Sequence, residues 1–172
     1  PCDWAWREGE RGRPEVGRPA TRLSFNLAHS AGLVVCALAA DRVVGADVEF
    51  RNRPPVDPGL VRRFCSPAEI ADIEGDGRDG WHDRFLRYWT LKEAYLKARG
   101  LGIAVPLADV SFALGPGGPR VSFLNSLTGT DQDWAFSLVD SGATHFIAVA
   151  APAPAGAAPD FVVEPFPSDL LP

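Results

Sequence analysis

The segment Trp89–Lys97 constrains this chain most strongly, because it places every lysine of the sequence in a pattern that predicts a helix. Lys92 and Lys97 are the only lysines among 172 residues, and the other fifteen of the 17 basic side chains are arginine. A lysine ammonium is a compact point charge that suits phosphate oxygens, whereas guanidinium is a planar fork. The segment is therefore expected to need ammonium groups, with phosphate as their natural partner.

Glu93 lies between the two lysines, four residues before Lys97. Residues four apart on a helix are neighbours on one face, so Glu93 and Lys97 are expected to lie side by side. An ordinary salt-bridged helix surface explains any single pair of this kind at least as well. The placement of the lysines and a second acidic motif upstream favour a functional role.

Asp47 and Glu49 form that second motif, within the apolar run Val43–Phe50. In a strand, residues two apart share a face, so both carboxylates point one way and Val48 points the other. A solvent-facing strand end is the commoner explanation for such a pair. The alternative is half of a site for a hard cation that prefers oxygen ligands, with magnesium the usual choice beside phosphates.

Taken together, Asp47, Glu49 and Glu93 offer three carboxylates, with Lys92 and Lys97 close by. Magnesium-assisted phosphoryl-type transfer needs these groups: a metal on the phosphate oxygens, cations for the developing charge and a carboxylate to accept a proton. Magnesium-dependent phosphate hydrolysis remains the rival interpretation. The sequence contains no Gly-x-Gly-x-x-Gly motif, no Walker loop and no nucleophile elbow.

The order of the expected elements is strands, then helices, then strands, which is typical of an α+β fold. We expect Leu33–Ala40 and Val43–Phe50 to pair as a hairpin. Ser66 and Glu69 predict a capping box, and Gly100 a helix end. The other expected elements are a strand at Leu23–Leu27, helices at Leu60–Phe64, 66–75 and Trp81–Arg99 with a turn at 76–80, and strands at Val110–Leu114, Arg120–Leu124, Trp134–Val139 and Thr144–Ala150.

Charge and cysteine content exclude several classes of protein. The net charge of −5 argues against a general nucleic-acid binder, which normally carries a basic excess. No apolar run approaches the length that spans a bilayer. The 3 cysteines are widely spaced, which favours a reducing compartment and gives no zinc site. We expect a cytoplasmic protein that binds neither nucleic acid nor membrane.

Three segments in order, Phe25–Ser30, Val44–Glu49 and Trp89–Lys97, closely resemble the 4′-phosphopantetheinyl transferase superfamily. The resemblance spans about Gly12 to Ala150 and is greatest to the single-chain type that serves polyketide and nonribosomal peptide synthetases. It implies an antiparallel sheet packed on a long helix, as one half of a pseudo-twofold pair. It also implies transfer of the phosphopantetheine arm of coenzyme A to a serine of an acyl or peptidyl carrier protein, releasing adenosine 3′,5′-bisphosphate.

The resemblance also implies roles for individual residues. Asp47, Glu49 and Glu93 would bind Mg²⁺, and Glu93 and Lys97 would be catalytic, with Glu93 as general base. Contacts to coenzyme A are implied for four basic side chains: Arg13, His29, Lys92 and Lys97. Lys92 has a second possible role, which is to orient the helix.

The resemblance divides the chain into residues 1–44, the end of a first half, residues 45–150, a complete second half, and a flexible tail at 151–172. Family members bind coenzyme A between two halves, so this chain is expected to be a shortened form or to pair with another chain. Ala28 also replaces the serine that usually precedes the histidine. These departures keep open a second hypothesis, a truncated or degenerate non-catalytic module that binds coenzyme A or a carrier protein.

Overall fold

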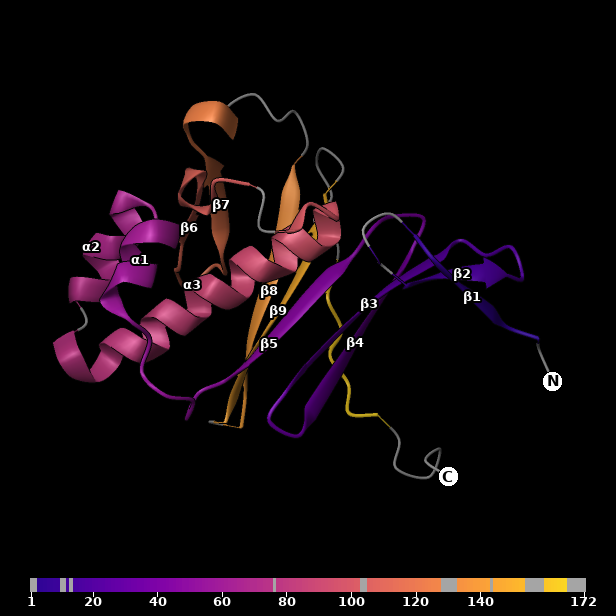
Figure 1. Ribbon diagram of the computed structural model, residues 1–172, viewed down its shortest axis with the longest axis horizontal. Coiled ribbons are helices and arrows are strands. Elements are labelled where there is room, and N and C mark those ends of the chain that lie inside the picture. Colours follow the sequence, from indigo (N-terminus) through magenta and orange to yellow (C-terminus); the bar gives the residue numbers. More distant parts are fainter. Residues whose placement is uncertain are drawn as a thin grey trace.

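The computed structural model arranges the chain in three layers, which confirms the α+β prediction (Figure 1). The middle layer is an antiparallel sheet with strand order β5–β9–β8. Its strands are β5 (Gly45–Phe50), β8 (Trp134–Ser141) and β9 (His145–Pro152). The structure describes residues 3–9, 12, 14–75, 77–102, 105–127, 133–142, 144–153 and 160–166.

Helix α3 (Gly77–Arg99) crosses one face of this sheet (Figure 1). The predicted end is confirmed, because Gly100 follows it at φ +62° and its N–H bonds to Lys97 O at 3.2 Å. The turn predicted at 76–80 is wrong from Gly77 onward, since the helix already begins there. Gly77 and Gly80 have weak helix propensity and so predicted a turn, but propensity is a weak signal that tertiary context overrides.

A two-stranded ribbon, β3 (Leu23–Ser30) and β4 (Leu33–Ala40), covers the opposite face of the sheet. Ala28 of β3 packs against Val48 and Ile147 of the sheet. The predicted hairpin between β4 and β5 is therefore wrong: β4 pairs with β3, and β5 pairs with β9. The side chains of β5 that face the ribbon are apolar. A place between two layers buries them more completely than a hairpin with β4 would.

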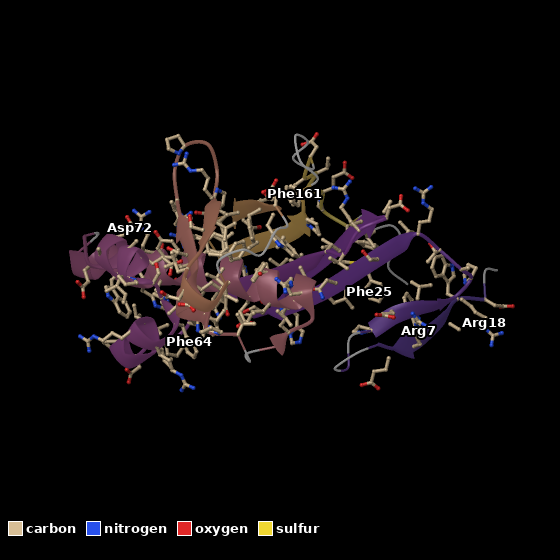
Figure 2. The ribbon with its side chains drawn as sticks, turned by 90° about the horizontal axis from the view of Figure 1, so that it is seen from above. Arg7, Arg18, Phe25, Phe64, Asp72 and Phe161 are labelled. Carbon is tan, nitrogen blue, oxygen red and sulfur yellow. The ribbon has the colours of Figure 1, made fainter. Side chains whose placement is uncertain are left out.

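Shorter elements complete the molecule at its two ends. Figure 2 shows Phe64 and Asp72 at one end and Arg7, Arg18 and Phe25 at the other. The capping box before α2 is confirmed, because Ser66 N–H bonds to Glu69 Oε2 at 2.7 Å and Glu69 N–H to Ser66 Oγ at 3.3 Å. The elements are β1 (Ala5–Glu8), β2 (Pro14–Arg18), α1 (Pro58–Phe64), α2 (Pro67–Gly75), η3 (Leu107–Asp109), β6 (Val110–Ala113), β7 (Arg120–Phe123) and η4 (Asn125–Leu127).

The face of the ribbon that points away from the sheet is apolar and exposed. Alternation along β3 and β4 gives this face a run of large side chains, and Trp6 meets Phe25 there at 5.2 Å between ring centroids. We call this surface the outer ribbon face. Its exposed large apolar side chains are Leu23 (47%), Leu27 (50%), Val34 (70%) and Leu38 (67%). Within the described ranges, no helix has the length and apolar character required to cross a membrane.

Candidate active site

The candidate site lies where β5 runs beneath α3, and a glycine sets the distance between them. A Cβ atom at Gly45 would lie 2.1 Å from Ala94 O and 2.3 Å from Ala98 N. Only glycine therefore fits at this position, and the strand backbone approaches the helix backbone directly. As predicted, Asp47 and Glu49 point to one face, which is the face that meets α3.

Asp47 forms an ion pair with Lys97 across this contact. Lys97 Nζ donates to Asp47 Oδ1 at 2.7 Å. The second oxygen, Oδ2, is buried and has no hydrogen-bond partner among the described residues. A buried carboxylate oxygen without a donor is costly, so this atom is suited to a ligand that brings positive charge.

Glu49 is held by two donors from different elements. Trp89 of α3 donates its indole N–H to Glu49 Oε1 at 2.9 Å. Arg53, in the loop after β5, donates to Glu49 Oε2 at 2.6 Å. Both oxygens are thus occupied, and their orientation is fixed.

Glu93 projects from α3 toward the same group of charges. Its Oε1 is buried and has no hydrogen-bond partner within the described part of the chain. Burial raises the pKa of Glu93, Lys97 opposes this and Glu49 adds to it. A carboxylate with a free acceptor atom and a raised pKa is suited to accept a proton.

Asp47 shows how close these groups lie to one another. Burial raises the pKa of Asp47 to about 7; Lys97 works against this rise, and Glu49 and Glu93 contribute to it. Three carboxylates and one ammonium therefore share a single electrostatic environment. The structure brings together Asp47, Glu49, Glu93 and Lys97, as the sequence predicted.

The donor set suits a hard cation, although the side chains are not arranged around one. Asp47 Oδ2 and Glu93 Oε1 are buried carboxylate oxygens that lack donors among the described residues, and oxygen is the ligand that Mg²⁺ prefers. Over the same ranges, no group of three or more His, Cys, Asp or Glu side chains is placed to hold a metal ion. The Mg²⁺ ligands Asp47, Glu49 and Glu93 therefore stay a prediction.

Lys92 lies outside this cluster, which corrects one sequence prediction. Its side chain has 0% exposure, and Nζ bonds to Glu69 Oε2 at 2.9 Å and to Leu107 O at 2.8 Å. A fully enclosed ammonium cannot reach a coenzyme phosphate, so the contact predicted for Lys92 does not hold in this structure. The structure is consistent with the alternative role, orientation of the helix.

His29 is not placed beside the carboxylates. His29 is exposed on β3, and Asn26 and Ser30 of that strand bond to the backbone N–H groups of Ala46 and Phe50. His29 alternates with these residues, so it lies on the outer ribbon face. Arg13 lies outside the described residues. A coenzyme contact for either residue stays a prediction.

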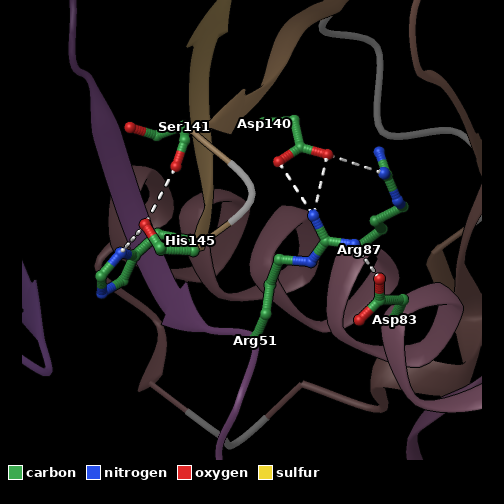
Figure 3. A network of polar contacts seen from close by, with 7 residues as sticks. Arg51, Asp83, Arg87, Asp140, Ser141 and His145 are labelled. Carbon is green, nitrogen blue, oxygen red and sulfur yellow. Dashed lines mark hydrogen bonds and ion pairs between the residues drawn. The ribbon is translucent and has the colours of Figure 1, made fainter.

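A polar network that sequence reasoning missed anchors the end of β5 (Figure 3). Arg51 forms ion pairs with Asp83 of α3 and, at 3.3 Å, with Asp140 of β8. Arg87 of α3 reaches the same Asp140 at 3.1 Å. The guanidinium groups of Arg51 and Arg87 lie 4.8 and 4.4 Å from the ring centroid of Phe146. This network anchors the end of β5 at Arg51, which lies two residues after Glu49.

Gly45 and Trp89 are two further contributors that the sequence analysis did not single out. A glycine at the start of an apolar strand is a known signal for close backbone approach, so Gly45 was detectable. The indole of Trp89 also borders a recess of about 270 Å³, together with Phe85, Phe64 and the loop that contains Arg53. Apolar surface therefore lies directly beside the carboxylate cluster.

Comparison with known proteins relates this chain to one protein family. A family model described as the 4′-phosphopantetheinyl transferase superfamily matches residues 43–150. The chain is 41% identical over 112 residues to the 4′-phosphopantetheinyl transferase HetI of Nostoc, covering 63% of this chain and 46% of that protein. It is 32% identical over 162 residues to a phosphopantetheinyl transferase of Thraustochytrium, covering 87% and 56%. The chain spans about half the length of the curated relatives it matches.

Solved structures with a similar fold include two holo-(acyl-carrier-protein) synthases. The enzyme of Bacillus anthracis, solved in complex with CoA (3′,5′-ADP), matches with a TM-score of 0.53 and 22% identity, covering 64% of this chain and 94% of that one. The enzyme of Thermotoga maritima matches with a TM-score of 0.52 and 22% identity, covering 64% and 62%. At this level of identity the likeness establishes the fold alone.

Proposed function

Because the chain belongs to the 4′-phosphopantetheinyl transferase superfamily, we propose that it transfers the 4′-phosphopantetheine arm of coenzyme A to a serine of an acyl or peptidyl carrier protein. The observation that carries this proposal is the meeting of Asp47, Glu49, Glu93 and Lys97 at one contact between strand and helix. In the reaction, the serine oxygen forms a bond to the phosphorus that bears the pantetheine arm. The bond from that phosphorus to the leaving phosphate breaks, and adenosine 3′,5′-bisphosphate departs.

Glu93 is the proposed general base of this reaction. The serine hydroxyl must lose its proton as it attacks, and the acceptor needs an available oxygen. Glu93 Oε1 is buried and has no hydrogen-bond partner among the described residues, so no hydrogen bond found there has to break first. Glu93 directly precedes Ala94, whose backbone meets β5 at Gly45.

Lys97 is the proposed cation for the phosphate oxygens. Its side chain is 32% exposed, and its ammonium pairs with Asp47. An incoming phosphate could therefore reach the ammonium from the solvent side. A fixed positive charge at this point stabilises the negative charge that develops on the leaving group.

Asp47, Glu49 and Glu93 are the residues that would hold Mg²⁺. When bound, Mg²⁺ would neutralise phosphate charge and withdraw electrons from the phosphorus that is attacked. The chain's own part is to supply acidic oxygens on a rigid strand and helix. The free buried oxygens of Asp47 and Glu93 support this assignment.

The remaining features of the substrates follow from the family relationship. We expect Arg13 and His29 to contact coenzyme A, and the carrier proteins to be those of polyketide or nonribosomal peptide synthesis. Residues 45–150 would supply the catalytic half, with residues 1–44 beside it. Ala28 offers no contact to the coenzyme, because it is 4% exposed and packs against Val48.

The proposal is tested by mass spectrometry of an apo carrier protein incubated with the chain, coenzyme A and Mg²⁺. We expect a gain of one phosphopantetheine arm that is lost on chelation and in Glu93→Ala. Glu74→Ala, an exposed acid on α2, is the control and should retain activity. If Glu93→Ala transfers as fast as the wild type, Glu93 is not the base and the proposed mechanism is wrong.

A non-catalytic module that binds coenzyme A or a carrier protein is the second candidate, and Ala28, buried where the family usually has a serine, favours it. Calorimetry with coenzyme A separates the two hypotheses. Binding that requires Mg²⁺ supports the enzyme, since the carboxylates of Asp47 and Glu93 would otherwise repel the phosphates. Metal-independent docking of a carrier protein without transfer supports the module.

A further inference from the structure

The ammonium of Lys92 occupies a closed cage of three oxygen acceptors. The acceptors are Glu69 Oε2 of α2 at 2.9 Å, Leu107 O of η3 at 2.8 Å and Val110 O of β6. An ammonium carries three N–H donors, so every donor has one partner. The side chain of Lys92 thus joins α3 to three other elements at a single atom.

The carboxylate of Glu69 is fixed just as firmly. Its Oε2 accepts from Ser66 N–H at 2.7 Å as well as from Lys92, and its Oε1 accepts from Phe112 N–H at 2.8 Å. Glu69 and Ser66 have 1% and 0% exposure. Fully satisfied buried networks of this kind select one arrangement of their elements.

The cage also explains why this position is lysine in a chain that otherwise uses arginine. Three acceptors converge from three directions on Nζ, which suits a tetrahedral ammonium. A guanidinium presents five donors in a plane and is larger, so it would leave donors unpaired in the same space. The requirement is for the shape of the ammonium, and no phosphate is involved.

Lys92 precedes Glu93 directly, and the two side chains point to different sides of α3. On the Glu93 side, the helix meets β5 through the close backbone contact at Gly45 and through two partly exposed polar pairs, Lys97–Asp47 and Trp89–Glu49. On the Lys92 side, the cage allows one rotational setting. We propose that Lys92 is a positioning residue, which fixes the rotation of α3 about its axis and thereby places Glu93 opposite the carboxylates of β5.

Lys92 can affect both the position of α3 and the stability of the protein, and the variants below separate these two effects. Lys92→Met leaves Glu69 as a buried unpaired charge, which destabilises the protein whatever else it does. Lys92→Met/Glu69→Met removes both charges with similar volume, an exchange that is often neutral for stability. Lys92→Arg keeps the positive charge, but the planar guanidinium does not match the three acceptors around Nζ. Ile73→Ala, a buried apolar change on α2, is the control for loss of stability.

The first readout needs no coenzyme. Trp89 lies on α3 one turn before Lys92, and its indole N–H bonds to Glu49 of β5. The indole N–H resonance in a ¹⁵N spectrum therefore reports whether α3 keeps its rotation relative to β5. We expect the resonance of Trp89 to move in Lys92→Arg and in Lys92→Met/Glu69→Met, and to stay in place in Ile73→Ala.

The second readout rests on the proposed function. A displacement of about 1 Å at a reacting group costs about 100-fold in rate, so kcat for transfer should fall by about this factor in the double variant, with KM for coenzyme A little changed. A double variant with the wild-type Trp89 resonance and wild-type kcat overturns the inference. If wild-type transfer is absent while the resonance still moves, the proposed function fails and the positioning role stands. If Lys92→Met does not fold, Lys92→Arg and the double variant carry the same test.

Discussion

Lys97 of α3 and Asp47 of β5 form a hydrogen-bonded ion pair, with Nζ 2.7 Å from Oδ1, across a contact that only a glycine permits. The two residues of the pair lie 50 positions apart in the sequence, and the pair links the acidic strand to the acidic helix. It also leaves the second oxygen of Asp47 buried without a described donor. The geometry of the candidate site thus depends on how closely strand and helix approach.

Gly45→Ala tests this close approach. The new methyl group would meet the backbone of Ala94 and Ala98, so β5 must move away from α3. Overpacking of this kind costs about 1–3 kcal/mol, and we expect that loss in the free energy of unfolding. Transfer activity should fall by more than the loss of folded protein explains. Chemical denaturation and a transfer assay on the folded fraction measure the two effects.

Gly115→Ala is the matched control for this change, because a Cβ at Gly115 meets no atom within 4 Å. It should leave both stability and activity near wild type. Equal behaviour of the two variants would contradict the role given to Gly45.

Trp89→Phe tests the orientation of Glu49. Phenylalanine keeps the aromatic packing against Phe85, where the ring centroids lie 6.0 Å apart, but removes the donor to Glu49. Hydrogen bonds to charged groups contribute about 1.5–3 kcal/mol, so the free energy of unfolding should fall by about that amount. Trp81→Phe removes an indole that stacks on the other side of Phe85 and should cost less. A smaller loss in Trp89→Phe than in Trp81→Phe would rule out the proposed hydrogen bond.

Arg51→Lys tests the network at the end of β5. Lysine keeps the charge but cannot pair with Asp83 and Asp140 together, because it lacks the planar fork. These side chains are partly exposed, so we expect the free energy of unfolding to fall by only about 1 kcal/mol. Arg120→Lys, at an exposed site on β7, is the control and should have no measurable effect. Thermal unfolding of both variants shows whether the ion pairs of Arg51 stabilise the fold.

Cys36 and Cys65 should differ sharply in their reaction with iodoacetamide at mildly alkaline pH. Burial raises the pKa of the Cys65 thiol to about 12, and its side chain is 3% exposed. Thiolate is the reactive form, so Cys65 stays protonated and inaccessible well above the pH at which an ordinary thiol reacts. Cys36 is exposed on the outer ribbon face. Peptide mass spectrometry should find the label on Cys36 alone of these two, and rapid labelling of Cys65 would contradict its buried position.

The outer ribbon face should make the chain associate as its concentration rises. Leu27, Val34 and Leu38 are at least half exposed on one face of β3 and β4, and contiguous apolar surface of this kind drives association. Val34→Lys and Leu38→Lys together should shift sedimentation toward the monomer. Val162→Lys, an equally exposed apolar site outside the ribbon, is the control. A wild-type chain that stays monomeric at all concentrations would refute this prediction.

Local patterns in the sequence were sufficient for most elements and for the facing of the acidic residues. Alternation placed Asp47 and Glu49 on one side of a strand, and the cap formed by Ser66 and Glu69 marked a helix start. Such features depend on neighbours along the chain, so sequence alone defines them. The α+β class followed from the order of these elements.

Features that depend on distant partners were not predictable. β5 pairs with β9, about 100 residues away, and no local signal distinguishes this pairing from a hairpin with β4. Lys92 and Lys97 are the same residue type on one helix, yet one is enclosed by α2 and β6 and the other reaches Asp47. Only the packing of the surrounding elements separates their roles.

The contact between Gly45 and α3 has a consequence for how the protein tolerates change. At Gly45, the acidic strand meets the acidic helix through main-chain atoms, with no side chain in between. A substitution that alters volume elsewhere in the interior, at Ile73 of α2 for example, adds no atom to this contact. The sensitivity of the site to added volume is therefore concentrated at one position that cannot gain even a methyl group.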